Sequence, residues 1–185
     1  MKLYVVRHGE TPSNISGIVS GRSSESLTEE GIKQSQIINQ KLADLKFTAV
    51  YVSPMKRTIE TAEIIVPEYK YIIDDRIAER DLGDLQNYTI DELWKMPLWN
   101  SLTELRTPEG AETFASGLER TRDFLSSLKS KYRQPSKNPA NEPQILLITH
   151  SFISRCIWSI VNDITDEETF KTFSHKNDEI KIYNI

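Results

Sequence analysis

The sequence is poor in cysteine and has no long apolar stretch. Its 185 residues include one cysteine, Cys156, so no disulfide can form within the chain. The longest unbroken run of apolar residues is four, far below the roughly 20 that cross a bilayer as a helix. A strand-like run begins at Leu3, so we expect no signal peptide. These absences exclude a membrane-spanning helix and favour a cytoplasmic protein in a reducing compartment.

The chain also lacks an excess of positive charge. Lys and Arg number 23 against 27 Asp and Glu, which gives a formal net charge of −4. Nucleic-acid-binding domains usually have a basic excess, so this balance argues against that class. The sequence contains no cluster with the spacing of metal ligands. We therefore expect no nucleic-acid partner, no membrane partner, no metal and no cofactor, and leave a homodimer open.

Length and composition indicate one domain. A chain of 185 residues with 38% apolar and 27% charged residues has the size and composition of a folded domain. Residues 133–143 contain three prolines and are expected to form an exposed loop rather than a domain boundary. The prediction is a single domain over residues 1–185.

Short apolar runs alternate with amphipathic segments along the chain. Residues 3–6, 47–52 and 144–149 are predicted strands, and each is followed by a helix-start signature, namely Thr11-Pro12, Ser53-Pro54 and Ser151. Longer helices are expected at about 28–45 and 111–131, and weaker strands at 70–73 and 179–183. The pattern Thr-x-x-Glu predicts short helices starting at Thr89 and Thr165. This alternation predicts a three-layer α/β/α fold, with a mainly parallel sheet and helices on both faces.

Basic and histidine side chains follow the three strong strands. Arg7-His8 follows the first strand, Arg57 lies just after the second, and His150 follows the third. The carboxyl ends of parallel strands meet at one edge of a sheet, where ligands bind. Helix N-termini at this edge add partial positive charge, and arginine holds two phosphate oxygens at once. The sequence therefore predicts a binding site for a phosphate dianion.

Other candidate residues are expected to be structural. Glu10 is interpreted as a buried hydrogen-bond partner, and Cys156 as a core residue on an apolar helix face. His175 is expected at the surface near the last strand.

Five motifs in order resemble those of the histidine phosphatase superfamily, also called the phosphoglycerate-mutase-like family. They are Arg7-His8-Gly9-Glu10-Thr11 with Asn14, then Ser20-Gly21-Arg22, Ser53 to Ala62, Glu79-Arg80-Asp81-Leu82-Gly83, and Leu147 to His150. Further matches occur at the start of the helix near Thr28 and in a Gly-x-Glu turn at 110–112. The resemblance runs the length of the chain and implies the fold predicted above.

The resemblance also implies a role for each motif. His8 would be the nucleophile and form a phosphohistidine, while Arg7, Arg57 and His150 would hold the phosphoryl oxygens. Glu79 would donate a proton to the leaving group and then take one from water. The side chain of Asn14 and the backbone of Ser20 and Gly21 would add neutral donors. No metal is needed for this chemistry, because cationic side chains balance the charge.

Several positions favour the phosphatase branch over the mutase branch. Phe152 and Leu82 stand where mutases have asparagine and tyrosine, and the mutases' basic insertion is missing. Ser151 and Asn87 replace glycines that are usual in the family. The leading interpretation is a metal-independent phosphomonoesterase acting on a small-molecule phosphate ester. A bisphosphoglycerate-dependent phosphoglycerate mutase and a non-catalytic phospholigand-binding protein remain alternatives.

A segment at about 84–108 is expected to act as a lid over the pocket. It contains Trp94 and Trp99, several other apolar residues, and two cations against four anions. A cap for a second anionic group should be basic, because burying an unpaired charge is costly. We therefore expect substrates with a neutral or apolar leaving group. The alternative is that both tryptophans pack into the core.

Overall fold

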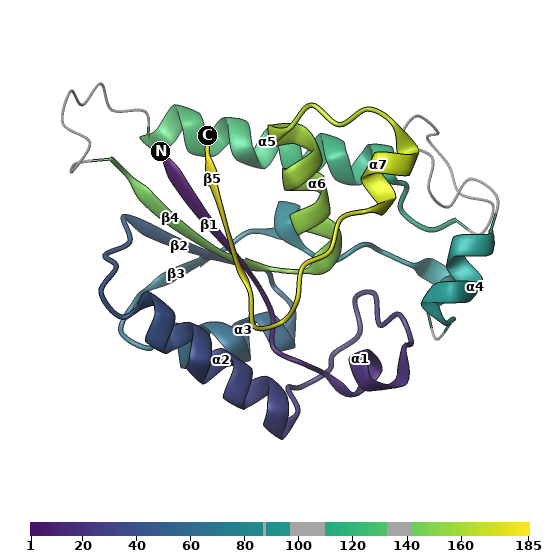
Figure 1. The fold of residues 1–185 in the computed structure, drawn as a ribbon, viewed down its shortest axis with the longest axis horizontal. Helices are drawn as coiled ribbons and strands as arrows, with labels where there is room; N and C mark the ends of the chain where they lie inside the picture. Colours follow the sequence, from purple (N-terminus) through teal and green to yellow (C-terminus); the bar gives the residue numbers. More distant parts are fainter. Residues whose placement is uncertain (87, 97–109, 133–141) are drawn as a thin grey trace.

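A five-stranded sheet forms the centre of the molecule (Figure 1). This computed structural model describes residues 1–86, 88–96, 110–132 and 142–185. The strand order is β3-β2-β4-β1-β5, and the first four are parallel while β5 runs antiparallel to β1. The strands are β1 Lys2–Arg7, β2 Ala49–Val52, β3 Tyr71–Ile73, β4 Gln144–Thr149 and β5 Ile180–Asn184. The sheet is thus mainly parallel, as predicted.

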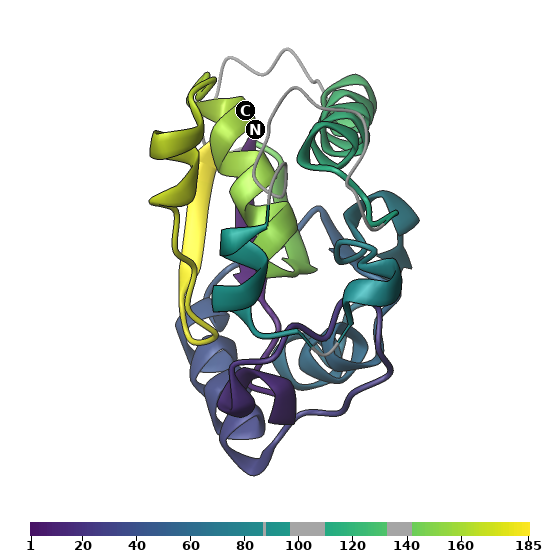
Figure 2. The ribbon, with the colours of Figure 1, turned by 90° about the vertical axis from the view of Figure 1, so that its right-hand side faces the viewer.

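Helices cover both faces of this sheet, which confirms the three-layer α/β/α fold (Figures 1 and 2). On one face lie α2 Glu29–Leu42 and α3 Lys56–Ile65, and on the other lie α5 Phe114–Tyr132 and α6 Ser151–Val161. Shorter helices are α1 Pro12–Ser16, α4 Ile90–Lys95 and α7 Glu167–Lys171, with 3-10 turns η1 Asp75–Ile77 and η2 Gly83–Leu85.

Successive side chains of the central strands enter different cores, because a strand alternates between its two faces. Leu3 and Val5 of β1 pack under α5 and α6, whereas Tyr4 and Val6 pack against α2 and α3. The predicted stripe of α5 is buried throughout, at Phe114, Leu118, Thr121, Leu125 and Leu128. The central strands β1, β2 and β4 are therefore shielded from water on both faces, and the polar groups that follow them lie at the strand ends.

Three helix caps differ from the sequence prediction by one or two residues. Helix α3 is capped at Met55 rather than Ser53, and His150 rather than Ser151 caps α6. Helix α7 begins after Asp166, whose carboxylate accepts from the Thr169 N–H at 2.7 Å, so Thr165 is not its cap. A carboxylate two bonds from the backbone competes well with a hydroxyl for that N–H. The shift at Ser53 frees its hydroxyl for a role in the site.

Some predictions lie partly or wholly outside the described residues. Of the expected lid at 84–108, the structure describes 84–86 and 88–96, which include η2 and α4. Leu82, Leu85, Leu93 and Ala111 form a small core under this part. Asn87, Trp99 and the loop 133–141 lie outside the described ranges. No helix in the described ranges is long and apolar enough to cross a membrane.

Candidate active site

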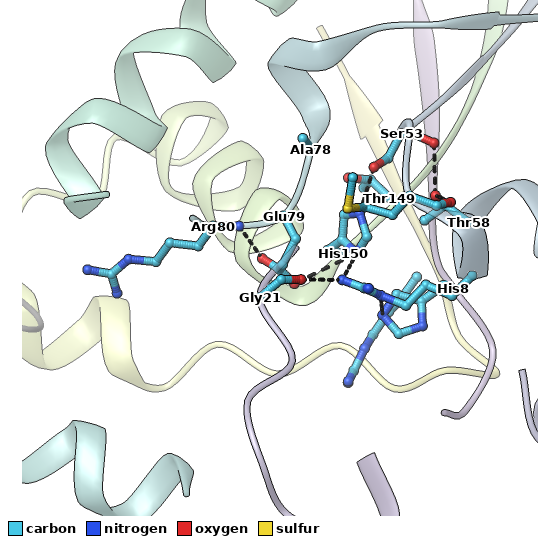
Figure 3. Close-up of polar contacts among 12 residues, drawn as sticks. His8, Gly21, Ser53, Thr58, Ala78, Glu79, Arg80, Thr149 and His150 are labelled. Atoms are coloured by element: carbon cyan, nitrogen blue, oxygen red, sulfur yellow. Dashed lines mark hydrogen bonds and ion pairs between the residues drawn. The ribbon is translucent and has the colours of Figure 1, made fainter. Parts of the chain in front are cut away.

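The candidate residues meet beyond the carboxyl ends of β1, β2 and β4, at the edge predicted from the sequence. Arg7 ends β1 and His8 follows it, while His150 follows β4. Arg57 lies in the first turn of α3, and Glu79 follows η1. Figure 3 shows His8 and His150 close together, with ring centroids 5.2 Å apart and planes at 61°.

Arg57 lies at the centre of the cluster and is fully buried. Its Nε donates to Nε2 of His8, and its Nη2 to Nδ1 of His150, both at 3.3 Å. The same guanidinium donates to the carbonyls of Gly21 at 2.8 Å and Ser23 at 3.0 Å. A planar group with five donors can hold all four partners at once. Arg57 therefore joins the two histidines to the loop that follows α1.

His8 is held as a neutral imidazole with its unprotonated nitrogen facing the arginine. Its Nδ1 lies 2.7 Å from the carbonyl of Gly9, an acceptor, so Nδ1 carries the proton. The lone pair of Nε2 faces Arg57. Burial lowers the pKa of His8 well below 6.5, and the charges of Arg57 and Arg7 lower it further. The ring is thus neutral at neutral pH, with its lone pair on Nε2.

His150 has the opposite tautomer. Arginine only donates, so Nδ1 of His150, which accepts from Arg57, carries a lone pair. The proton lies on Nε2, which donates to the hydroxyl of Ser53 at 2.6 Å. Burial and the charge of Arg57 lower the pKa of His150 well below 6.5. Ser53, interpreted from the sequence as a helix cap, instead fixes the second histidine; the residue pattern gave no signal for this role.

The Glu79 side chain is partly buried, with 16% of its surface exposed, and lies beside the two histidines (Figure 3). Its Oε2 lies 3.8 Å from Nδ1 of His150, and its Oε1 accepts from the Arg80 N–H at 2.8 Å. Burial raises the pKa of this carboxyl above 4.5, although Arg57, Arg7 and Arg120 oppose the rise. A carboxyl with a raised pKa can both donate and accept a proton near neutral pH.

Arg7 is positioned from the C-terminal part of the chain. Its Nη1 donates to the carbonyl of His175 at 2.9 Å. His175 is only 2% exposed, so the expectation of a surface residue was wrong. Its Nδ1 lies 2.6 Å from the Ser154 hydroxyl and its Nε2 lies 3.1 Å from the Glu179 carbonyl. Such partners cannot be seen in a linear sequence, because α6 and the residue just before β5 supply them.

The neutral groups expected to bind phosphate divide into two kinds. Asn14 lines the cavity, and its Oδ1 accepts from the Thr11 N–H at 3.2 Å and from Asn177 at 3.4 Å, which leaves its amide N–H groups to donate. Ser20 and Gly21 also line the cavity. The Gly21 carbonyl is an acceptor for Arg57, so part of this loop positions the arginine rather than the ligand.

The site opens into a cavity of about 480 Å³. Arg7 and His8 form one part of its wall, and the apolar residues include Val19, Leu82, Ile90, Phe114 and Phe152. Arg80 and Arg155 also line it, and neither was identified from the sequence as a pocket residue. The Arg80 side chain points away from His8 in Figure 3 and lies 4.2 Å over the Phe114 ring. The pocket wall thus contains cations beyond the expected phosphate site.

The remaining structural interpretations agree with the structure. Glu10 is half-buried and accepts from the Thr28 hydroxyl at 2.8 Å, and Cys156 is fully buried in the core. Ser151 lies in the cavity wall, and Phe152 packs on Phe114 with ring centroids 5.2 Å apart. The described residues contain no group of three or more His, Cys, Asp or Glu that could hold a metal ion.

Known proteins share this sequence pattern over almost its whole length. The family model of the histidine phosphatase superfamily, branch 1, matches residues 3–185. The chain belongs to this superfamily. The family resemblance seen in the motifs is therefore confirmed.

Relatives within the superfamily include both phosphatases and mutases by name. The chain is 38% identical over 135 residues to a Danio rerio protein named "Probable fructose-2,6-bisphosphatase TIGAR A", covering 68% of this chain but only 52% of that relative. It is 31% identical over 167 residues to "Probable phosphoglycerate mutase GpmB" of Yersinia pestis, covering 86% and 74%. Its fold is similar to the alpha-ribazole phosphatase from Shigella flexneri, with a TM-score of 0.79, 22% identity, and coverage of 100% and 91%.

Proposed function

We propose that the chain is a metal-independent phosphomonoesterase that works through a phosphohistidine on Nε2 of His8. The observation that carries the proposal is the state of His8. Its Nδ1 proton is fixed on the Gly9 carbonyl, and its Nε2 lone pair is directed at the arginine that would hold a phosphoryl group. A neutral, oriented imidazole is the form that can attack phosphorus.

In the first step Nε2 of His8 forms a bond to phosphorus while the ester P–O bond breaks. The Glu79 carboxyl gives its proton to the departing oxygen, which leaves as an alcohol. In the second step water attacks the phosphohistidine, Glu79 takes the water's proton, and the P–N bond breaks to release inorganic phosphate. The raised pKa of Glu79 supports both roles, because the carboxyl can hold a proton before the first step.

Charge at the transferring phosphoryl group would be balanced by Arg7 and Arg57. Both are largely withdrawn from water, where their charges act more strongly than in bulk solvent. His150 lies beside Arg57, and its Nδ1 is near the Glu79 carboxyl.

For the substrate we propose a phosphomonoester with a neutral or apolar leaving group. The apolar side chains of Leu82, Phe114 and Phe152 in the cavity wall support this proposal. Arg80 and Arg155 favour the competing class, esters with a second anionic group, and the experiment below separates the two. The apolar contact of Phe152 with Phe114, in place of a mutase asparagine, gives no support to mutase activity.

The test is turnover of an aryl phosphate, 3-phosphoglycerate and bisphosphoglycerate by the wild-type chain and His8→Ala, each with a chelator present. The wild type is expected to prefer the aryl phosphate, to be insensitive to the chelator, and to trap a labelled phosphoenzyme. His8→Ala should lose both turnover and trapping. Full activity in that variant would end the mechanism, and preference for phosphoglycerates would end the proposed substrate class. Binding of phosphate without turnover would favour the non-catalytic alternative.

A further inference from the structure

The segment between α7 and β5 contacts three residues of the candidate phosphate site. The side chain of Asn177 donates to the backbone carbonyl of His8 at 2.6 Å and to Oδ1 of Asn14 at 3.4 Å. The carbonyl of His175 accepts from Arg7 at 2.9 Å. Asn177 also lines the cavity. Residues more than 160 positions apart in sequence are thus joined beside the proposed nucleophile.

The chemistry of these contacts fixes the orientation of two amides. A backbone carbonyl only accepts, so the nitrogen of Asn177 must face His8. Its second N–H can then meet Oδ1 of Asn14, which also accepts from the Thr11 N–H. With two donors on its oxygen, Asn14 keeps that oxygen turned away from an incoming anion. Its own N–H groups are the ones left to face the ligand.

The segment is itself firmly anchored. His175 is buried and contacts the Ser154 hydroxyl of α6 and the carbonyl of Glu179. Glu179 accepts from the Lys176 N–H at 3.1 Å and pairs with Lys181 at 2.8 Å. Because these contacts already fix the segment, ordering the Asn177 side chain costs little further conformational entropy. Asn177 can therefore hold the residues that it contacts in place.

We propose that Asn177 is a positioning residue of the phosphate site, acting through the backbone of His8 and the side-chain amide of Asn14. It keeps the Asn14 oxygen away from the phosphoryl oxygens and the His8 backbone in place for attack. Asn177 lies in none of the sequence motifs of the site. This assignment deepens the proposed function and rests on it for the identity of the ligand.

The variant Asn177→Asp has the same shape but offers no N–H donor. The carbonyl of His8 and Oδ1 of Asn14 would lose their N–H donor and gain a negatively charged neighbour. Misplacement of the reacting groups by about 1 Å can lower the rate about 100-fold. We expect kcat/KM for an aryl phosphate to fall by about 100-fold and vanadate to bind at least about tenfold more weakly. Asn39→Asp is the matched control, because Asn39 is also half-buried and donates to a backbone carbonyl, that of Ile65, at 2.7 Å. The control should lower the melting temperature as much as Asn177→Asp but leave vanadate affinity unchanged.

A double-variant comparison separates positioning from general structural support. If Asn177 acts partly through Asn14, the loss of vanadate affinity in Asn14→Ala/Asn177→Ala will be smaller than the product of the two single losses. The assignment would be overturned if the loss in the double variant equalled the product of the two single losses. It would also be overturned if vanadate affinity in the variants simply followed their melting temperatures. Vanadate binding with the expected coupling but no turnover would refute the proposed phosphatase and leave the Asn177 assignment standing. Absence of vanadate binding in the wild type would overturn both.

Discussion

His8 and Glu79 have pKa values that burial moves in opposite directions. Loss of water disfavours the charged form of each, so the pKa of the imidazole falls and that of the carboxyl rises. In water the histidine would hold a proton more tightly than the carboxyl. Burial therefore moves the two pKa values toward one another. These shifts favour a neutral nucleophile beside a protonated acid, which is the combination that the first step requires.

At this scale we predict that Glu79→Gln slows alkyl phosphates far more than aryl phosphates. An alkoxide is a strong base and needs a proton as it leaves, whereas an aryloxide is a weak one, and general acids contribute about 10²–10⁴-fold. The variant should also lose the fall in kcat/KM that the wild type shows as pH rises through the pKa of Glu79. Steady-state kinetics with both ester types from pH 5 to 8 measure this. Equal slowing of the two would instead direct attention to Asp81.

Helix α2 and the loop after β1 fit together through two glycines. A Cβ on Gly31 would lie 2.3 Å from the carbonyl oxygen of Glu10, and one on Gly9 would lie 2.4 Å from the carbonyl oxygen of Gly31. The Thr28 N–H donates to the Glu10 carbonyl at 2.9 Å, and Gln34 accepts from the Glu10 N–H at the same distance. The first turns of α2 therefore fix the position of the loop that begins with His8.

At the scale of elements we predict that Gly31→Ala reduces both stability and activity. The methyl group would meet backbone atoms, which cannot turn away as a side chain can, and overpacking of this kind costs about 1–3 kcal/mol. Urea unfolding and kcat/KM measure the two effects. Gln36→Ala, an exposed position on the same helix, serves as the control and should change neither. Unchanged stability and activity in Gly31→Ala would contradict this view of the α2 contact.

All three histidines are buried, and this links the stability of the whole molecule to pH. The pKa values of His8 and His150 fall well below 6.5, and that of His175 falls to about 4. As pH falls below 6.5 the unfolded chain therefore binds protons that the folded chain does not. The raised pKa of Glu79 acts in the other direction, because only the folded chain holds that proton above pH 4.5. Three histidines outweigh one carboxyl, so acid favours the unfolded state.

At the scale of the whole molecule we predict that the free energy of unfolding falls between pH 6.5 and 5. A net difference of about two protons corresponds to a slope of about 3 kcal/mol per pH unit at its steepest. Urea unfolding without added phosphate at several pH values measures the slope. His175→Asn keeps a polar group near the Ser154 hydroxyl but cannot titrate. The slope of its unfolding free energy against pH should therefore correspond to about one proton fewer. A flat profile from pH 7 to 5 would refute the prediction.

The order of strands and helices could be read from local sequence patterns. Apolar runs such as 144–149 form buried parallel strands, and the stripe of α5 faces the core as its spacing requires, because burial of apolar surface decides both. Element ends were less predictable. Ser53 and Ser151 have the chemistry of helix caps, yet His150 and Met55 occupy those positions, because the contacts of the site determine where α3 and α6 begin.

The sequence by itself placed two histidines and two arginines after strands that end at one edge, and the family resemblance added Glu79. It could do so because alternating strands and helices favour parallel strands, whose carboxyl ends meet at one edge of a sheet. Only the tertiary structure decided the proton positions of His8 and His150, the burial of His175, and the contacts of Ser53 and Asn177. The physical reason is that tautomers and pKa values depend on desolvation and on partners within about 3 Å, and these partners come from segments that are distant in the chain.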